Sequence, residues 1–284
     1  MNVKDIMRTE ISCLYVPGNR GSALKLIQEK NIKLIPILKK GSRKLLGIVT
    51  HQEIIKKPDE EDLAMLMNRE PVTIQQNISI IEAIKIISKD NNRILVVLDE
   101  DQVVGLLTVH LIIKNVLAKK NFQTPIKSYI KVGITSIWDK TPLQNALYIM
   151  QIARISILPC IDDSGALSGV ISFEEIMKES EIIAEDHSSS LLDTSEDYSW
   201  SWKAENTLLI TKKHLKLPDK LVKDIMIKKG QIQSVNELTS IKECANKMRK
   251  FELDQLAVLD VNDNFIGMIY DRDLIFVLLD PEMK

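Results

Sequence analysis

The stretch Leu45-Leu46-Gly47-Ile48-Val49-Thr50-His51-Gln52-Glu53-Ile54-Ile55 decides the fold, because its pattern returns three more times along the chain. The later copies occupy residues 103–113, 167–177 and 265–275. Self-similarity of this kind is the signature of a repeat protein. We therefore expect four copies of one supersecondary unit.

Each copy predicts a strand that turns at once into a helix. The apolar residues after the glycine are typical of a buried strand, and the apolar residues three to four positions later mark one face of a helix. A glycine in a strand permits close approach of another backbone or of a ligand. At this strand-to-helix corner, free N–H groups and a carboxylate one turn into the helix are placed to bind a sugar-phosphate.

The corner residues also have a purely structural interpretation. Thr50 with Glu53, and Ser172 with Glu175, have the spacing of a capping box, in which hydroxyl and acid satisfy free N–H groups at a helix start. Asp273, in a first helical turn, is favoured by the helix dipole. At this point both capping and ligand binding remain open.

Around each copy the chain repeats the order helical turn, strand, helix, strand, strand and helix. Val3–Met7 predicts the first helical turn, and the same five residues return at Val222–Met226. Pro36 lies in a predicted strand, where a proline is better suited to an edge or an irregular end. The predicted first strands span 11–16, 71–74, 133–137 and 232–235, and the helices after them span 22–30, 79–89, 142–153 and 241–250. The predicted units span 1–57, 63–120, 121–179 and 218–284.

Residues 180–217 are predicted to be an insertion with a different composition. Glu185–Asp197 is polar and acidic, which predicts an exposed loop. Thr207–Thr211 has the composition of a strand. Between them, Trp200 and Trp202 alternate with polar residues, so they either cover a hydrophobic edge or dock a partner protein.

The overall composition excludes several classes of protein. The chain has 284 residues, of which 45% are hydrophobic and 27% charged, and its net charge is -1, so no global basic field favours nucleic acid. No apolar run approaches the roughly 20 residues that span a bilayer, and a cytoplasmic location is expected. Cys13, Cys160 and Cys244 lack metal-ligand spacing and are expected to be buried. No catalytic set or phosphate-binding loop is recognisable, so we predict that the chain is not an enzyme.

Together these features resemble four CBS (cystathionine-beta-synthase) domains. The resemblance rests on the order of elements, the x-Pro-x strand around Pro36 and Pro159, the Val-Lys-Asp-Ile-Met opening and the Gly-apolar-apolar-Thr/Ser-x-x-acid ending. It covers nearly all of the chain outside the insertion. Four such units are similar to the gamma regulatory subunit of AMP-activated protein kinase and to archaeal stand-alone CBS proteins.

The resemblance implies an α/β (α+β) fold of four CBS repeats. Each repeat is expected to hold a small three-stranded sheet and two helices. Consecutive repeats should pair through their sheets into two modules, roughly residues 1–120 and 121–284. The two modules should then form a disk, within one chain or across a homodimer.

The resemblance also implies a non-catalytic sensor that needs no cofactor and binds AMP, ADP, ATP or a related adenosyl ligand in clefts between paired units. In the family, the corner acid binds the ribose, the corner hydroxyl and a basic residue before the x-Pro-x strand contact phosphate, and a hydroxyl on the first strand lies near the base. The residues of this chain at those positions are Lys33, Thr50, Glu53, Thr73, Arg93, Thr108, Ser136, Ser172, Glu175, Ser234 and Asp273.

Every unit departs from the family pattern somewhere. Glutamate replaces the corner aspartate in the first and third units, at Glu53 and Glu175. Leu111 stands where the second unit should carry its acid. In the fourth unit, Tyr270 replaces the corner hydroxyl and Asp254 occupies the position of the basic residue. The number of functional clefts is therefore open.

Two other functions are compatible with the sequence. The chain could be a structural adaptor whose clefts are empty and whose Trp-bearing insertion docks a protein partner. It could also bind nucleic acid through local lysine patches, although the near-neutral net charge disfavours this. The identity of the ligand, the partner and the oligomeric state are left open.

Overall fold

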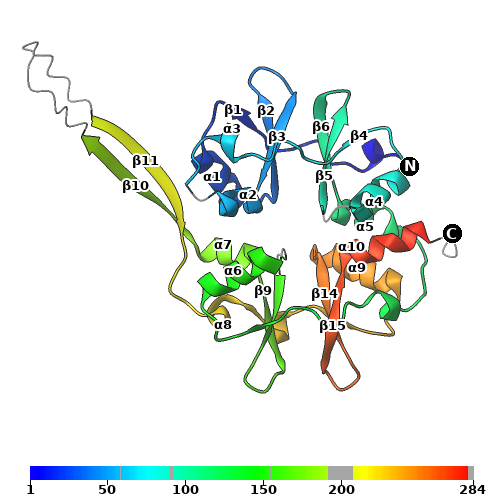
Figure 1. Ribbon diagram of the computed structural model, residues 1–284. Coiled ribbons are helices and arrows are strands. Elements are labelled where there is room, and N and C mark those ends of the chain that lie inside the picture. The colour runs from blue at the N-terminus through cyan, green and yellow to red at the C-terminus, as the bar shows by residue number, and fades with distance from the viewer. Residues whose placement is uncertain (58, 90–91, 154, 156, 191–206, 281–284) are drawn as a thin grey trace, which may run out of the picture.

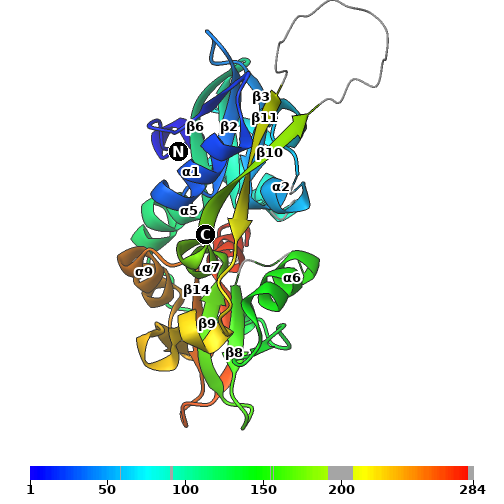
Figure 2. The same cartoon turned by 90° about the vertical axis from the view of Figure 1, so that its left-hand side faces the viewer.

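The computed structural model describes residues 1–280 apart from 58, 90–91, 154, 156 and 191–206, and for 55, 182–190 and 207–215 it describes only the backbone. Four similar units form a ring, in the order first, second, fourth and third (Figure 1). Figure 2 shows the ring from its side, with the first two units above the last two.

The first unit shows how the sequence forms each element. Asn19 caps its first long helix by accepting a hydrogen bond from the backbone N–H of Ser22, and the helix ends at Asn31 in the left-handed conformation. The elements are η1 (Val3–Asp5), β1 (Leu14–Val16), α1 (Arg20–Lys30), β2 (Leu34–Lys39), β3 (Leu45–Thr50) and α2 (His51–Lys56).

The other three units repeat this order. The second contains α3 (Leu63–Leu66), β4 (Thr73–Gln75), α4 (Ile80–Lys89), β5 (Ile94–Asp99), β6 (Gln102–Thr108), α5 (Val109–Asn115) and η2 (Leu117–Lys119). The third contains η3 (Ile126–Tyr129), β7 (Ile137–Trp138), α6 (Leu143–Ala153), β8 (Ile157–Ile161), β9 (Leu167–Ser172) and α7 (Phe173–Glu179). The fourth contains α8 (Val222–Ile225), β12 (Ile227–Lys228), η4 (Lys229–Gln231), β13 (Ser234–Asn236), α9 (Ile241–Phe251), β14 (Gln255–Leu259), β15 (Phe265–Tyr270), α10 (Asp271–Ile275) and η5 (Phe276–Leu279).

Every unit has the same sheet, as predicted from the repeats. The first strand pairs in parallel with the second, and the second forms an antiparallel hairpin with the third. The third unit gains a fourth strand, because β12 pairs with β9. Pro36 lies in the middle strand, but pairing with β1 begins only at Ile37, so its missing N–H breaks no ladder on that side.

Consecutive units pair through their sheets into two modules, as expected. Leu34, Leu38, Val96, Val103 and Leu106 form a core between the first two sheets. A smaller core of Leu167, Ala257 and Met268 joins the last two. Each module is therefore held by apolar side chains that neither unit could bury alone.

The units of a module also exchange the segments that open them. Arg8, in the opening segment of the first unit, forms backbone hydrogen bonds with Leu106 of the second, while Asn68, in the opening segment of the second, forms them with Ile48 of the first. The last two units repeat this exchange, through Lys131 with Met268 and through β12 with β9.

The exchange explains the glycine in every copy of the repeated stretch. A Cβ atom at Gly47 would lie 2.4 Å from the Asn68 carbonyl oxygen and 2.9 Å from the Met67 sulfur. Gly105, Gly169 and Gly267 face the Arg8, Ile227 and Lys131 carbonyls at 2.7, 2.6 and 2.4 Å. Of the two explanations that the sequence left open, close approach of another backbone is the one observed.

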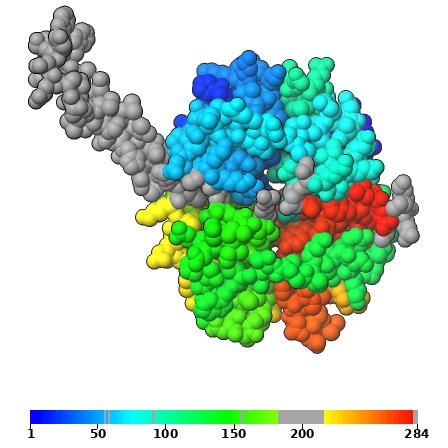
Figure 3. Space-filling view, in the orientation of Figure 1, coloured from blue at the N-terminus to red at the C-terminus, as the bar shows by residue number. Residues whose placement is uncertain are grey.

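The contact between the two modules is different on the two sides of the ring. One continuous core joins the second and fourth units, including Ile112 and Ile113 of α5, Met248 of α9 and Leu274 of α10. Between the first and third units, Phe173 and Met177 of α7 join the core of the first unit, and the Gln28 side-chain amide donates a 2.6 Å hydrogen bond to the Ser180 carbonyl. Figure 3 shows the two modules meeting across the middle of the ring.

Two predictions of secondary structure are wrong. The predicted strand Gly133–Ile137 is only β7 (Ile137–Trp138), because Lys131 is bonded to the fourth unit and the chain must cross between units before it can join the sheet. The predicted loop Glu185–Asp197 begins inside a strand, since β10 (Glu181–Ser190) pairs with β11 (Thr207–Lys216). Pairing along this hairpin, called the arm below, outweighs the weak strand propensity of its serines. Trp200 and Trp202 lie outside the described residues.

Candidate functional site

In the first, second and fourth units, the hairpin register places the corner beside the residue that precedes the second strand. Leu34 pairs with Thr50, Ile94 with Thr108, Ile157 with Ser172, and Gln255 with Tyr270. Lys33 and Arg93 therefore lie next to the corners of their own units. The hairpin turns point to the rim of the ring, and the corners point to its middle (Figure 1).

Two corners are capping boxes. The Glu53 carboxylate accepts hydrogen bonds from the Thr50 backbone N–H at 2.9 Å and from its hydroxyl at 2.5 Å, while Thr50 Oγ1 accepts from the Gln52 N–H at 3.1 Å. Ser172 and Glu175 repeat this arrangement, with the Glu175 carboxylate 3.1 Å from the Ser172 nitrogen. These acids satisfy the helix starts in the way the structural interpretation predicted.

The other two corners differ. Thr108 Oγ1 accepts a 3.1 Å hydrogen bond from the Leu111 N–H, and Leu111 supplies no acid. Tyr270 makes no side-chain cap, and Asp273 Oδ1 lies 3.8 Å from the Lys131 ammonium. The Asp273 side chain is 15% exposed. Among the corner acids, Glu53 and Glu175 are engaged in capping boxes and Asp273 is not.

The first-strand hydroxyl residues do not share one environment. Thr73 on β4 and Ser234 on β13 are half-buried and pair with Val96 and Ala257. Ser136 is exposed and precedes β7, so the structure leaves it outside the sheet.

Lys33 contacts the second module at the middle of the ring. Its ammonium lies 2.7 Å from Asp254 Oδ2 of the fourth unit and 2.9 Å from Glu174 Oε1 of the third. Burial lowers the pKa of Lys33, but the two carboxylates outweigh burial and leave the pKa raised. For Glu174 and Asp254, burial acts in the opposite direction and raises the pKa. Their cationic neighbours outweigh burial and leave both pKa values below the usual range.

Arg93 also reaches the second module. Its guanidinium donates a hydrogen bond to the Asp271 carboxylate and a 2.9 Å hydrogen bond to the Asp254 carbonyl oxygen. The Asp271 side chain is only 2% exposed. Burial raises the pKa of Asp271 to about 7, although Arg93 opposes this shift. We call Lys33, Arg93, Glu174, Asp254 and Asp271 the central ion cluster.

Sequence reasoning named three residues of this cluster but did not predict that they form ion pairs. It singled out Lys33 and Arg93 as ligands of a phosphate and noted Asp254 as a departure from the pattern. It missed Glu174 and Asp271, which occupy the first turns of α7 and α10. An acid next to each corner was the available signal, but only the packing of the two modules shows which cation it meets.

Histidines and cysteines add no second site in the described residues. His51 packs against Phe173 of the second module with ring centroids 4.3 Å apart, and burial lowers its pKa. Cys160 and Cys244 are buried, as predicted, and burial raises the pKa of each to about 12. Cys13 is only partly buried. No group of three or more His, Cys, Asp or Glu side chains that could hold a metal ion occurs in the described part of the chain.

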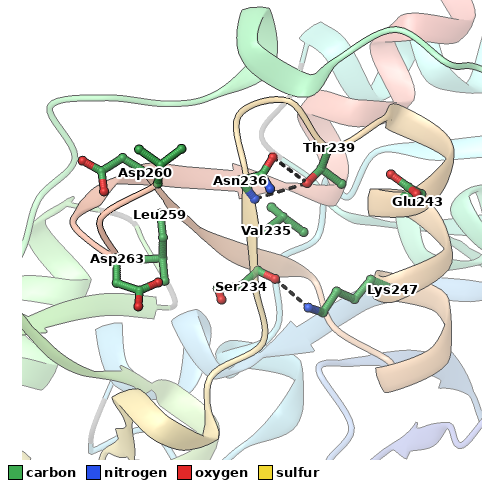
Figure 4. Close-up of a pocket in the computed structure, with 10 residues that line it drawn as sticks. Ser234, Val235, Asn236, Thr239, Glu243, Lys247, Leu259, Asp260 and Asp263 are labelled. Atoms are coloured by element: carbon green, nitrogen blue, oxygen red, sulfur yellow. Dashed lines mark hydrogen bonds between the residues drawn. The ribbon is translucent and has the colours of Figure 1, made fainter.

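A polar groove lies away from the corners, on the fourth unit (Figure 4). It has a volume of about 470 Å³ and lies between β13, α9 and the turn from β14 to β15. Lys247 donates a 2.6 Å hydrogen bond to the Ser234 carbonyl inside it. Ser234 is the one predicted ligand residue that lines this groove, and neither Tyr270 nor Asp273 does.

This architecture defines a class of protein: tandem α/β repeats that exchange their opening segments, pair through their sheets and converge on a shared centre. The chain belongs to the CBS domain family, whose profile matches residues 3–60, 61–118, 126–181 and 222–280. Among the described residues, no helix is long and apolar enough to cross a membrane.

Two archaeal proteins share the whole architecture. MJ1225 from Methanocaldococcus jannaschii is 21% identical over 294 residues, covering 96% of this chain and 97% of that protein. Its crystal structure, described as that of a candidate archaeal homologue of g-AMPK, has a TM-score of 0.77 and covers 98% of this chain and 100% of that chain. An uncharacterised conserved protein from Pyrococcus horikoshii has a TM-score of 0.65 at 24% identity, with 98% and 100% coverage.

Proposed function

We propose that this chain is a non-catalytic regulatory protein that binds an adenine nucleotide or a related adenosyl ligand in clefts between paired CBS units. In this proposal the corner acids bind the ribose and the corner hydroxyls and backbone N–H groups face the 5′ substituent. Occupancy changes the packing of the two modules, and a partner protein responds to that change.

The shared hairpin register is the observation that carries the proposal. It lays a hydroxyl residue, a helix start and a charged residue together at the central end of a sheet in the first two units, around Lys33 with Thr50 and Arg93 with Thr108. A carboxylate that accepts hydrogen bonds from a hydroxyl, as Glu53 does from Thr50, has the chemistry to accept them from a ribose diol instead.

A ligand panel tests the proposal. A ligand that binds the folded state raises the melting temperature, and a concentration of 100 times Kd adds about 2.7 kcal/mol to the free energy of unfolding. We expect at least one of adenosine, AMP, ADP, ATP and S-adenosylmethionine to raise the melting temperature, and the matching guanosine compounds and a short RNA to leave it unchanged. A flat response to every adenosyl compound would reject the proposal.

The arm favours a second candidate, a structural adaptor with empty clefts. Strands β10 and β11 run outward from the side of the ring formed by the first and third units (Figures 1 and 2). Such an arm is suited to docking a protein partner. An adaptor of this kind would bind its partner equally well with and without adenosyl ligands, whereas a sensor would not.

A further inference from the structure

Both cations that the family pattern assigns to phosphate are neutralised by the protein itself. Lys33 bridges Asp254 and Glu174, at 2.7 and 2.9 Å, and Arg93 is bound to Asp271. The central ion cluster thus contains three carboxylates and two cations. The cluster therefore has one more negative than positive group. Asp254 supplies a negative charge at the position where the first two units carry the cations Lys33 and Arg93.

All three carboxylates are more buried than Lys33, and Asp271 is far more buried than its partner Arg93. The Glu174, Asp254 and Asp271 side chains are 20%, 25% and 2% exposed, against 45% for Lys33 and 27% for Arg93. A phosphate that took Lys33 or Arg93 from these partners would leave a carboxylate without its cation in a poorly hydrated place. The bound phosphate would also be repelled by the neighbouring carboxylates, which are negatively charged as well.

We propose that the adenosyl ligand of this chain carries no phosphate, and that its 5′ substituent is neutral or cationic. This inference rests on the proposed function, since it names the class of ligand that the same clefts accept. Asp254 and Glu174 are then specificity-determining residues: they hold Lys33 and disfavour an anionic 5′ group, while a neutral thioether or a cationic sulfonium leaves the cluster intact.

Titration calorimetry of the full chain at pH 7.5 tests the proposal with five probes: adenosine, methylthioadenosine, S-adenosylmethionine, AMP and ATP. We expect the best of the three phosphate-free probes to bind at least tenfold more tightly than AMP and ATP. Equal or tighter binding of AMP or ATP would overturn this inference but leave the proposed function standing. If none of the five binds, both fail.

Two charge-removing variants test the role of the carboxylates. Asp254→Asn and Glu174→Gln each keep the shape of the side chain and remove one of the two negative charges that attract the Lys33 ammonium. We expect either variant to tighten AMP binding at least fivefold and to change adenosine binding less than twofold. Asp163→Asn is the matched control, because Asp163 pairs with Lys140 at 2.5 Å in another part of the third unit. Unchanged AMP affinity in both Asp254→Asn and Glu174→Gln would contradict the assignment.

Discussion

Lys33 and Asp254 hold the same place in their repeats, directly before the second strand, yet they carry opposite charges and lie 2.7 Å apart across the middle of the ring. The fourth unit thus offers the first module an anion at the position where the first two units carry a cation. The opposite charge at this position allows Lys33 and Asp254 to form an ion pair between the two modules. The contact is partly exposed, so we expect it to contribute less to stability than to specificity.

Because Asp271 is buried, the free energy of unfolding should fall as pH rises, whereas for most ion-paired acids it rises with pH. Its pKa is raised from 3.8 to about 7 by burial. The folded state therefore binds this proton more tightly than the unfolded state, and the stabilisation falls as pH rises from about 4 to about 7, by at most about 1.4 kcal/mol per pH unit.

Denaturant unfolding of the parent and of Asp271→Asn at pH 5 and pH 7.5 measures this effect. Asparagine cannot ionise, so we expect the parent to lose stability relative to the variant between the two pH values. A parent that gains stability relative to Asp271→Asn would mean that the Arg93 pair lowers the pKa of Asp271 instead.

Gly47→Ala should destabilise the first module. The added Cβ would lie 2.4 Å from the Asn68 carbonyl oxygen, which is backbone and cannot move aside without disturbing the exchanged segment. Overpacking of this kind costs about 1 to 3 kcal/mol. Gly230→Ala is the control, because a Cβ there meets nothing within 4 Å. Thermal unfolding should show a lower melting temperature for Gly47→Ala alone, and equal effects of both changes would count against the close-approach explanation.

Replacing the arm should leave ligand binding nearly intact. Glu181 and Lys216 are paired across the two strands, so a short Gly/Ser linker can join Ser180 to Leu217 without pulling on the ring. The arm carries no corner residue, and we expect the affinity for adenosine to stay within a few-fold in calorimetry. Complete loss of binding would mean that the arm supplies contacts to the ligand. Loss of a partner with unchanged ligand affinity would favour docking through the arm.

The sequence predicted the fold well because four copies of one pattern constrain one another. Glycine in a strand predicted a close approach, and the exchange around Gly47 is that approach. Ser136 shows the limit of such reasoning: its hydroxyl occupies the right position in the pattern, but the chain is still crossing between units there and the residue is exposed.

The site was harder to predict than the fold, because the central ion cluster forms between repeats and not within one. Lys33 was singled out as a phosphate ligand, which stays a prediction, and its two carboxylate partners come from the third and fourth units. Nothing in the spacing of a single unit indicates which unit faces it across the ring. Asp271 was missed for the same reason, since only the packing of α5 against α10 brings Arg93 to it.

Substitution of the corner acids is the most direct test of ligand binding. In the structure, Glu53 and Glu175 belong to capping boxes, whereas Asp273 does not. Asp273 is outside a capping box, and its ion pair with Lys131 is long at 3.8 Å, so Asp273→Asn should cost little stability. Glu53→Gln keeps a residue that can still close a capping box. If these acids bind a ribose diol, each lost charge-assisted hydrogen bond contributes about 1.5 to 3 kcal/mol.

We therefore expect Asp273→Asn and Glu53→Gln to weaken adenosine binding roughly ten- to a hundredfold, with little change in the melting temperature of the ligand-free protein. Glu175→Gln should do the same only if the third unit takes part in an occupied cleft. Titration calorimetry and thermal unfolding of the three variants measure both quantities. Should all three variants bind adenosine as the parent does, the corner acids do not bind the ribose, which must then be held elsewhere.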